Sequence, residues 1–336
     1  MTQTSSAEIE AARLLLARLG VSVADLLATA APPTAVPTFA EYVPIVSAAV
    51  GAGTRRVYSS YWNRLVEHWG ARRLDEPTPT EIRQLTETLK TAVTVRRNAR
   101  GGRSATEHFI AALRCVYTNA ENDGLISPGA NPALKVAKPR RLTSTRRAIP
   151  DAQLAEINQI AATTGNDPAL DSLILRLHTE TACRRGGGLA LTPRDLDATQ
   201  CLIRLNEKGD TVRWQPVSPT LMSHLLHHAE SRNAPPNGQL LRYSNGRPIT
   251  KRRYDYIWER IGRQLPWVAT QQISTHWLRH TTLTWVERNC GYARAFAGHT
   301  DAPAAGTTAT YVKATLPELA QALATLTGEP HPLANS

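Results

Sequence analysis

The sequence predicts a mainly α-helical protein that carries one small antiparallel β-sheet. Apolar residues recur at helical spacing through most of the chain, for instance from Val57 to Trp69. The exception is a pair of short apolar stretches, residues 201–206 and 211–217, which flank a polar turn at 207–210 and are typical of a β-hairpin. Hydrophobic residues make up 42% of the 336 residues, which is enough for the cores of two domains.

The first 37 residues are expected to form one helix followed by a linker. Residues 7–30 are amphipathic, with leucines at helical spacing. The stretch from Ala31 to Pro37 contains three prolines, which break a helix and are typical of a linker. Because a lone amphipathic helix needs a surface for its apolar face, we expect residues 7–30 to dock elsewhere, a neighbouring protomer being one option.

Residues 38–137 are predicted to form a small helical domain with basic loops. A first helix is expected from Thr54, which can cap it, to about Arg73. A second helix begins near Thr80, after two prolines, and a third is capped by Ser104. A glycine-punctuated turn rich in arginine separates the second helix from the third.

A basic, almost wholly polar linker, residues 138–148, is predicted to separate this domain from a second one, residues 149–336. The second domain contains the predicted hairpin. A helix capped by Asp151 and further helices near residues 170–178, 221–230, 251–264, 277–288 and 316–326 are expected to surround it.

The charge of the chain points to a polyanionic partner. Its 39 Lys and Arg exceed its 28 Asp and Glu, which gives a net charge of +11. Residues 41–147 alone carry +9, against −1 for residues 1–40 and +3 for the remainder. Such a concentrated positive field favours nucleic acid or an anionic membrane. Solubility combined with an arginine-rich genome is the simpler alternative.

The candidate DNA contacts lie in the arginine-rich turn and in the basic linker. They are Arg96, Arg97, Arg100 and Arg103 in the turn, and Lys138, Arg140, Arg141, Arg146 and Arg147 at the linker. The planar fork of arginine suits phosphate oxygens, and a basic linker could follow a phosphate backbone. The alternative is a solvated connector.

Several function classes are not expected. No apolar run approaches the ~18 residues needed to span a bilayer, and the N-terminus lacks the pattern of a signal peptide. The four cysteines are scattered without a CxxC pair, which argues against a disulfide framework and a zinc ribbon. His276 and His280 form HxxxH, but the glutamate of HExxH is absent. We therefore expect a cytoplasmic protein without a metal.

A set of short motifs in the second domain combines groups that bind and activate phosphate. His276 and Arg279 are three residues apart on an expected helix, so they share a face and can address one ligand. Histidine supplies a base near neutral pH, and arginine supplies a bidentate cation. The other members, in chain order, are Arg184, Lys208 in the hairpin turn, His299 after a glycine, and Tyr311 twelve residues beyond it.

This ordered set, behind a basic helical domain, resembles the tyrosine recombinase (phage integrase) family over about residues 150–315. The resemblance implies a helical core-binding domain followed by a mostly helical catalytic domain with a small antiparallel sheet. It also implies that the catalytic residues are Arg184, Lys208, His276, Arg279, His299 and Tyr311.

The resemblance implies a site-specific recombinase or integrase that breaks and rejoins DNA. The two arginines would bridge the nonbridging oxygens of the scissile phosphate, with His299 as a third donor. Tyr311 would attack with His276 as its base, and Lys208 would protonate the departing 5′-oxygen. The product is a 3′-phosphotyrosyl bond. Because one phosphate ester replaces another, neither ATP nor a metal cofactor is expected.

The implied partners are double-stranded DNA, further copies of the chain in a tetramer on paired sites, and an accessory or directionality protein at the nucleoid. No membrane partner is expected. Two other functions stay open. A type IB topoisomerase-like enzyme would use a very similar constellation to relax DNA. A DNA-binding protein that has lost catalysis is suggested by the glycine run 186–188.

The chain departs from the family pattern in two places. The family commonly has an acidic residue three positions after the first arginine, where this chain has Gly187, and Arg185 or Glu180 could compensate. The stretch from His299 to Tyr311 is a few residues longer than usual, which leaves open whether the tyrosine acts in its own site or in a neighbour's.

The C-terminal tail is predicted to form one more helix. Thr315 can cap it, Pro317 is tolerated in its first turn, and leucines from Leu316 to Leu326 give it an apolar stripe. A helix of about eleven residues needs a docking surface. That surface is either its own domain or, as often in the resembled family, a neighbouring protomer.

Overall fold

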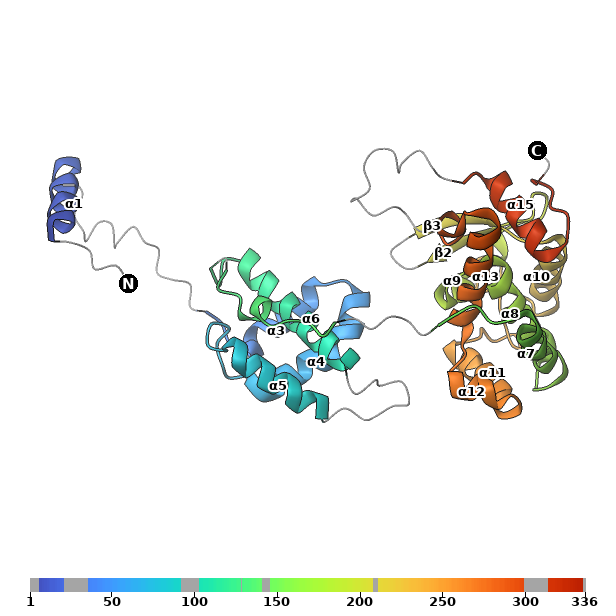
Figure 1. Ribbon diagram of the computed structural model, residues 1–336, viewed down its shortest axis with the longest axis horizontal. Coiled ribbons are helices and arrows are strands. Elements are labelled where there is room, and N and C mark those ends of the chain that lie inside the picture. The colour runs from blue at the N-terminus through green and yellow to red at the C-terminus, as the bar shows by residue number, and fades with distance from the viewer. Residues whose placement is uncertain are drawn as a thin grey trace. The chain divides into compact units, whose positions relative to one another are not determined.

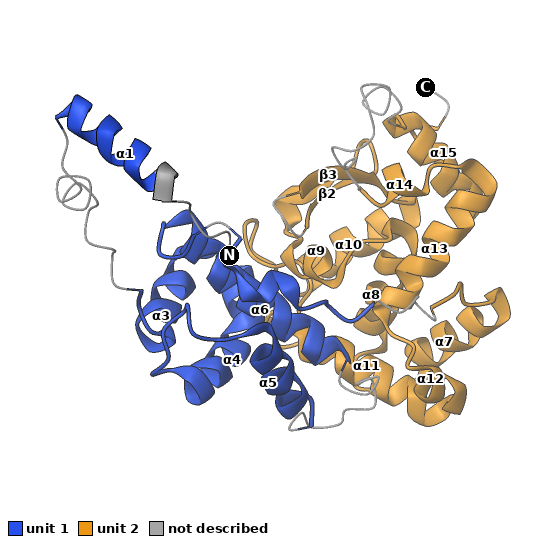
Figure 2. Ribbon diagram, turned by 60° about the vertical axis from the view of Figure 1, so that its left-hand side comes forward, with its two compact units in different colours: residues 1–143 blue, residues 144–336 orange. Residues whose placement is uncertain are grey.

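The computed structural model describes residues 6–20, 36–91, 103–127, 129–140, 146–207, 211–298 and 314–334. The chain divides into two compact units, residues 1–143 and residues 144–336 (Figures 1 and 2). Helices dominate both units, and the second also holds a three-stranded antiparallel sheet. The predicted fold class is therefore confirmed. Within the described residues, no helix is both long and apolar enough to cross a membrane.

The described part of the first unit is helical. Its elements are α1 (Ser6–Leu19), α3 (Phe39–Ala49), α4 (Ala52–Trp69), α5 (Pro79–Thr91), α6 (Arg103–Asn122) and the short 3₁₀ helix η2 (Pro132–Lys135). A capping box starts α3, in which the Thr38 hydroxyl accepts from the Glu41 amide and the Glu41 carboxylate accepts from the Thr38 amide. Thr78 and Glu81 pair in the same way at the start of α5.

The core of the first unit is aromatic, and its polar atoms are paired. Phe39, Trp62 and Tyr117 are almost fully buried. The indole of Trp62 donates to Ala112 O at 3.0 Å, and the Tyr117 hydroxyl donates to Leu74 O at 3.0 Å. These bonds avoid the penalty of a buried polar group without a partner, because each donor keeps an acceptor in the core.

Some predicted helix boundaries are wrong. The N-terminal helix α1 ends at Leu19, because Gly20 adopts φ +68°, a left-handed conformation that stops a helix. Thr54 is not a cap, since Gly51 holds that position for α4. Ser104 lies inside the first turn of α6. Asp151 is the first residue of its helix rather than its cap.

In the second unit, helices pack against the sheet (Figure 1). Its helices are α7 (Asp151–Thr163), α8 (Pro168–Thr181), α9 (Arg185–Ala190), α10 (Pro219–Ser231), α11 (Lys251–Gln264), α12 (Pro266–Gln271), α13 (Thr275–Cys290), α14 (Ala293–Phe296), α15 (Leu316–Thr327) and the 3₁₀ helix η3 (Pro193–Asp195). Helices α7 and α13 both pack on α8, whose apolar residues Leu170, Ile174 and Leu177 are fully buried.

The sheet has the order β1-β2-β3, with β1 (Leu196–Asp197), β2 (Leu202–Glu207) and β3 (Thr211–Pro216). Strands β2 and β3 pair antiparallel from Leu202 opposite Pro216 to Glu207 opposite Thr211, which confirms the predicted hairpin. Along β2, Ile203, Leu205 and Glu207 are buried while the residues between them are exposed. The alternation places the carboxylate of Glu207 on the core face of the strand.

The C-terminal helix α15 packs on its own unit. Its residues Leu319 and Leu323 are buried, and Leu319 belongs to a small apolar cluster with Ala182, Val286 and Phe296. Helix α15 lies against β3 and α13 (Figure 2). Of the two docking surfaces expected for the tail, the structure shows the one within the same domain.

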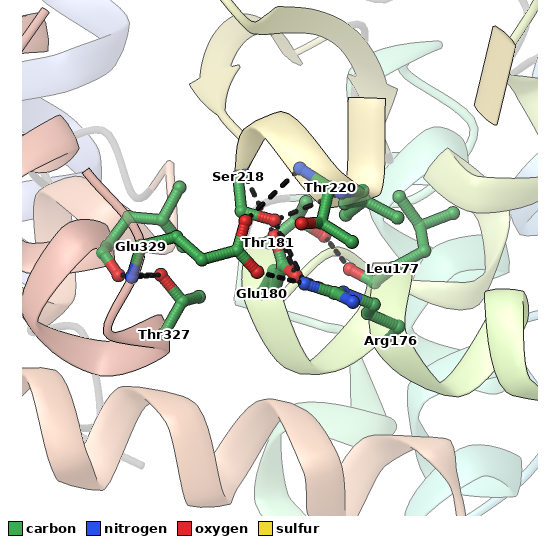
Figure 3. A network of polar contacts seen from close by, with 10 residues as sticks. Arg176, Leu177, Glu180, Thr181, Ser218, Thr220, Thr327 and Glu329 are labelled. Atoms are coloured by element: carbon green, nitrogen blue, oxygen red, sulfur yellow. Dashed lines mark hydrogen bonds and ion pairs between the residues drawn. The ribbon is translucent and has the colours of Figure 1, made fainter. Parts of the chain in front are cut away.

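The residues after α15 fasten the tail to α8 and α10 (Figure 3). Arg176 on α8 donates to Glu180 at 2.6 Å and to Glu329 at 2.6 Å. Glu329 also accepts from the Thr220 amide at 3.2 Å, at the start of α10. Glu180 in turn accepts from the amide and the hydroxyl of Ser218 at 2.9 and 3.0 Å. This network joins three elements that are far apart in the sequence.

Candidate functional site

The site begins at the turn that follows α8. Ala182 has φ +50°, a left-handed conformation that residues other than glycine rarely adopt. The buried ring of His178 braces this turn, with Nδ1 at 3.0 Å from Cys183 O and Nε2 at 3.0 Å from the Tyr254 hydroxyl. The turn that leads into Arg184 is therefore held by the core beneath it.

Arg184 lies at the N-terminus of α9, against the end of β2. Its backbone amide donates to Glu207 Oε1 at 2.6 Å, and its Nη1 donates to Glu207 Oε2 at 2.9 Å. The Glu207 side chain is 0% exposed, whereas that of Arg184 is 36% exposed. The guanidinium thus lies between a buried carboxylate and solvent, where a bound phosphate could reach it.

A second arginine reaches the same carboxylate from β3. Arg213 faces Leu205 in the sheet register, and its Nε lies 3.6 Å from Glu207 Oε2. Its Nη2 donates to Thr181 O at 3.2 Å, and its Nη1 contacts the amide oxygen of Gln215. The side chain is only 10% exposed, and burial lowers the pKa of its guanidinium although Glu207 opposes that shift.

The third arginine of the site, Arg279, comes from α13. It is buried and donates from Nη1 to Ala182 O and from Nη2 to Ala297 O at 3.0 Å. Burial, and then the positive charge of Arg184, lower the pKa of Arg279 to about 10, so it stays protonated at pH 7. Arg279 ties the turn after α8 to the end of α14.

Gly298, which follows Ala297 at the end of α14, lies against the side chain of Arg213. It has φ +65°, and a Cβ added there would lie 2.3 Å from Arg213 Cδ. Glycine is needed at this position for two reasons, because both the left-handed backbone and the close arginine exclude a side chain. This explains the glycine of the Gly298-His299 motif.

His276 lies one turn before Arg279 on α13 and is exposed. Partial desolvation and then the positive charges of Arg146, His280, Arg279 and Arg184 lower its pKa to about 4. The imidazole is therefore neutral at pH 7 and can accept a proton. Its ring lies 4.8 Å from that of His280, centroid to centroid, in an edge-to-face arrangement.

The described residues thus bring together three of the six predicted catalytic side chains: Arg184, His276 and Arg279. The other three, Lys208, His299 and Tyr311, lie outside the described residues. In the sequence, Lys208 directly follows Glu207 and His299 directly follows Gly298. What the arrangement can do chemically is bind an anion between positive groups beside a neutral base.

The predicted DNA contacts are described in part. Arg103, Lys138, Arg140, Arg146 and Arg147 are exposed, and Arg96, Arg97, Arg100 and Arg141 lie outside the described residues. In the first unit, Arg103 Nη2 donates to Arg140 O at 3.4 Å, which joins the start of α6 to the basic linker. In the second, Arg147 Nη2 donates to the Gln271 side chain at 3.4 Å.

Two residues of the site, Glu207 and Arg213, escaped the sequence-based interpretation. Period-two alternation along β2 was the available signal, since it assigns Glu207 to the same face as the apolar Ile203 and Leu205. An acidic residue on a core face requires a buried partner. The sequence does not say which cation provides it.

Among the described residues, no group of three or more His, Cys, Asp or Glu side chains is placed to hold a metal ion.

The model of the phage integrase family matches residues 147–315 of the chain. A comparison with curated proteins finds no match.

Solved structures of tyrosine recombinases share the fold at low identity. A lambda integrase tetramer bound to a Holliday junction is similar with a TM-score of 0.60 and 14% identity, over 91% of this chain and 90% of that one. The Tn1549 transposon integrase in complex with circular intermediate DNA gives 0.63 and 15%, over 83% and 95%. The XerH site-specific recombinase bound to palindromic difH gives 0.58 and 13%, over 78% of each chain.

Proposed function

Because the chain belongs to the phage integrase family, we propose that it is a site-specific recombinase that cleaves and rejoins DNA through a 3′-phosphotyrosyl intermediate. The observation that carries the proposal is the convergence of Arg184 and Arg279 on one turn. Arg184 directly follows the turn after α8, at the start of α9. Arg279 donates to the carbonyl oxygen of Ala182 in the same turn. Two guanidinium groups from distant segments thereby form one positive site.

The proposed reaction exchanges one phosphate ester for another. The Tyr311 hydroxyl attacks the scissile phosphorus, the bond from phosphorus to the 5′-oxygen breaks, and the DNA keeps a free 5′-hydroxyl. His276, which is neutral at pH 7, takes the tyrosine proton. Lys208 gives a proton to the departing oxygen. The number of phosphoester bonds is unchanged, so the proposed reaction needs neither ATP nor a metal.

The proposed role of the two arginines is to stabilise charge in the transition state. Negative charge grows on the nonbridging oxygens as the tyrosine adds, and preorganised donors stabilise it better than they stabilise the ground state. Arg184 and Arg279 would hold two of those oxygens, with His299 as the third donor. Both arginines are fixed by bonds to carboxylate or backbone, so little reorganisation is needed.

The proposed partners are double-stranded DNA and further copies of the same chain. The lambda integrase relative is a tetramer on a Holliday junction, and the Tn1549 and XerH relatives are also bound to DNA. We propose a tetramer on paired sites, with the exposed cations of the basic linker on the phosphate backbone. An accessory or directionality protein, and a place at the nucleoid in the cytoplasm, are further expectations.

The test has two stages, because the target site must be found first. Covalent protein–DNA adducts are captured from cells that express the protein, and the DNA junctions are sequenced. Nicked duplexes that carry the mapped site are then incubated with the purified chain. The proposal predicts a covalent adduct and strand exchange between two sites.

Other outcomes separate the alternatives. A covalent adduct with relaxation of supercoiled DNA and no strand exchange would identify a topoisomerase-like enzyme. Specific binding with no adduct would identify a DNA-binding protein without catalysis.

Tyr311→Phe provides the matched control for the chemistry. It removes one hydroxyl and no charge, so it should abolish the adduct and leave the affinity for DNA nearly unchanged. A Phe variant that forms adduct at the normal rate would exclude Tyr311 as the nucleophile.

A further inference from the structure

We propose that Glu207 is the positioning residue of the phosphate site, and that it occupies the space left by the absent side chain at Gly187. In this role Glu207 fixes Arg184 and balances the charge of the neighbouring arginines. The inference rests on the proposed function, since it assigns a role within the same site. Three features of the Glu207 carboxylate support it: its hydrogen bonds, the charges around it and the space beside it.

The carboxylate of Glu207 holds Arg184 at two points. Oε1 accepts the backbone amide and Oε2 accepts Nη1, at 2.6 and 2.9 Å. Together they fix both the start of α9 and the direction of the side chain. A guanidinium group has five N–H donors, so one bond to Glu207 leaves others for a phosphate. Glu207 therefore orients Arg184 without replacing its ligand.

The charge of Glu207 is needed because the surroundings are positive. Arg213 lies 3.6 Å from the same carboxylate oxygen, and Arg279 is close enough to Arg184 for its pKa to be lowered by it. Three guanidinium groups around one carboxylate leave a net charge of about +2. That excess suits a phosphodiester that gains negative charge as it reacts. Without the Glu207 carboxylate, the positive charges of Arg184, Arg213 and Arg279 would repel one another with no anion between them.

The space for this carboxylate exists because residue 187 is glycine. A Cβ on Gly187 would lie 3.2 Å from Glu207 Cγ, which is tighter than ordinary packing, and 3.4 Å from Oε1. Gly187 has no left-handed backbone that would demand glycine. Its neighbour Gly186 has nothing within 4 Å of the same added atom. A side chain at position 187 would thus need Glu207 to shift by a few tenths of an ångström, whereas position 186 is open.

The two residues expected from the sequence to compensate for Gly187 are engaged elsewhere. Glu180 accepts from Arg176 and from Ser218 in the network that also holds Glu329 (Figure 3). Arg185 lies 3.6 Å from the carboxylate of Asp255 on α11. The acidic group that the resembled family carries on the helix after the first arginine is supplied here from the end of β2.

The proposal predicts that the acidic group can be moved from one side of the gap to the other. Glu207→Ala removes it, and Gly187→Asp adds a carboxylate from α9 into the same space. Each single variant should be worse than the double variant Gly187→Asp/Glu207→Ala. Gly186→Asp combined with Glu207→Ala is the matched control, because position 186 does not face the gap and should give no rescue.

The first measurement is the thermal unfolding of the full chain without DNA. Glu207→Ala and Gly187→Asp should each lower Tm by about 3 °C or more, and the double variant should recover at least half of that loss. Additive losses in the double variant would overturn the exchange of positions. This result does not depend on whether the protein cleaves DNA.

The second measurement is the rate of covalent adduct formation beside the affinity for the same nicked duplex. Glu207→Ala should slow the adduct about 100-fold and change Kd by less than about threefold, because removing a negative charge does not weaken binding to DNA. Glu207→Gln keeps an acceptor for the Arg184 amide, so its rate of adduct formation should lie between those of the wild type and Glu207→Ala. The double variant Gly187→Asp/Glu207→Ala should form the adduct faster than Glu207→Ala alone.

The outcomes separate the proposed function from the proposed role of Glu207. A wild-type chain that forms no adduct, with rescue still seen in Tm, would refute the proposed function and leave the exchange between residues 187 and 207 intact. A wild-type chain that cleaves DNA, with Glu207→Ala equally active and stable, would overturn the role of Glu207 alone. Equal loss of rate and affinity without rescue would also overturn it, since that is the signature of a damaged fold.

Discussion

Gly298 shows how one residue can be fixed by two independent physical demands. Its left-handed φ of +65° disfavours any L-residue, and Arg213 occupies the space in which a side chain would lie. The motif Gly298-His299 is recognisable in the sequence as a pattern, without a reason for its first member. The reason lies on β3, 85 positions earlier, and only the fold brings the two together.

Gly298→Ala should therefore destabilise the second unit by more than the backbone strain alone. Strain of this kind costs of order 1 kcal/mol, and displacing a buried arginine adds to it. Gly291→Ala is the matched control, because Gly291 has φ +74° but nothing within 4 Å of an added Cβ. We expect Gly298→Ala to cost about 1–3 kcal/mol more than the control, measured by chemical unfolding. Equal losses of unfolding free energy in the two variants would mean that the Arg213 side chain can move aside at no cost.

The pH dependence of cleavage should report the environment of His276. Its pKa is lowered to about 4, so the neutral base persists well below the ordinary value for histidine. As pH falls, kcat/KM for adduct formation should stay nearly flat down to about pH 5 and decline only below that. This parameter reports groups of the free enzyme, and binding of the duplex at each pH serves as its control.

Arg146→Gln tests the cause of that shift. Arg146 is the positive charge with the largest effect on His276, so its removal should raise the pKa and move the acid limb toward higher pH. A wild-type limb near pH 6.5, unmoved by Arg146→Gln, would exclude His276 as the titrating base.

Residues that carry a motif could be predicted from the sequence, and residues that support them could not. Arg184 and Arg279 lie in recognisable patterns, and the structure brings both to one turn. Glu207 sits next to a predicted catalytic lysine, yet its role depends on a three-dimensional gap beside Gly187. Sequence spacing carries no information about such a gap, because it is formed by backbone segments 20 residues apart.

At the scale of elements, regular periodicity was a reliable guide. Of the four predicted caps, the one at Thr315 is confirmed, and those at Thr54, Ser104 and Asp151 are wrong. The hairpin and the helices α8, α10, α11, α13 and α15 lie where the pattern predicts them. Helix α3 was missed because it contains Pro44 and directly follows a proline-rich stretch. Its capping box from Thr38 to Glu41 was the available signal. A box of this kind outweighs one interior proline when the helix is packed through Phe39 and Val46.

The residues that follow α15, Glu329 and His331 among them, should determine how stably this helix packs on its unit. Glu329 binds Arg176 and the Thr220 amide, and the buried His331 lies 3.2 Å from Cys201 O. Truncation after Thr327 removes these contacts and should lower the free energy of unfolding by about 1–3 kcal/mol. Hydrogen exchange should quicken in α15 more than in α8. Truncation after Leu333 keeps all three contacts and should change neither the free energy of unfolding nor the exchange rate in α15.

Because α15 covers apolar core, removing the whole tail would destabilise the second unit in addition to any effect on contacts between protomers. Truncation after Val312 would expose Val286 and Phe296, which pack against Leu319. A loss of strand exchange in that variant would therefore report unfolding as well as assembly. The shorter truncation after Thr327 separates the two, since it leaves the apolar face of α15 in place. Cooperative binding to paired sites should persist in it.

At the scale of the whole molecule, composition predicts the kind of partner. The charge excess of the chain is concentrated in residues 41–147, and the described cations at its end, Lys138, Arg140, Arg146 and Arg147, are exposed. Charge cannot predict how the two compact units are organised, because it acts at long range and specifies no contacts. Packing decides that, as the separate cores of the two units show.

The described cations of the basic linker are exposed, so DNA phosphates can reach them. Replacing Arg140, Arg146 and Arg147 by Gln should weaken binding to all DNA sequences alike, because phosphate contacts carry no base information. Removing one cation from a DNA phosphate should lower the slope of log Kd against log salt by about 0.9, so the triple variant should have a slope smaller by between about two and three units. The control replaces Arg73 and Lys90, which lie 2.9 Å from Asp75 and Glu87 in the first unit. Those cations already have anionic partners, so their removal should leave the slope within about 0.5 of the wild-type value. If both variants keep the wild-type slope, the linker is a solvated spacer, and the positive field that recruits DNA must come from other residues.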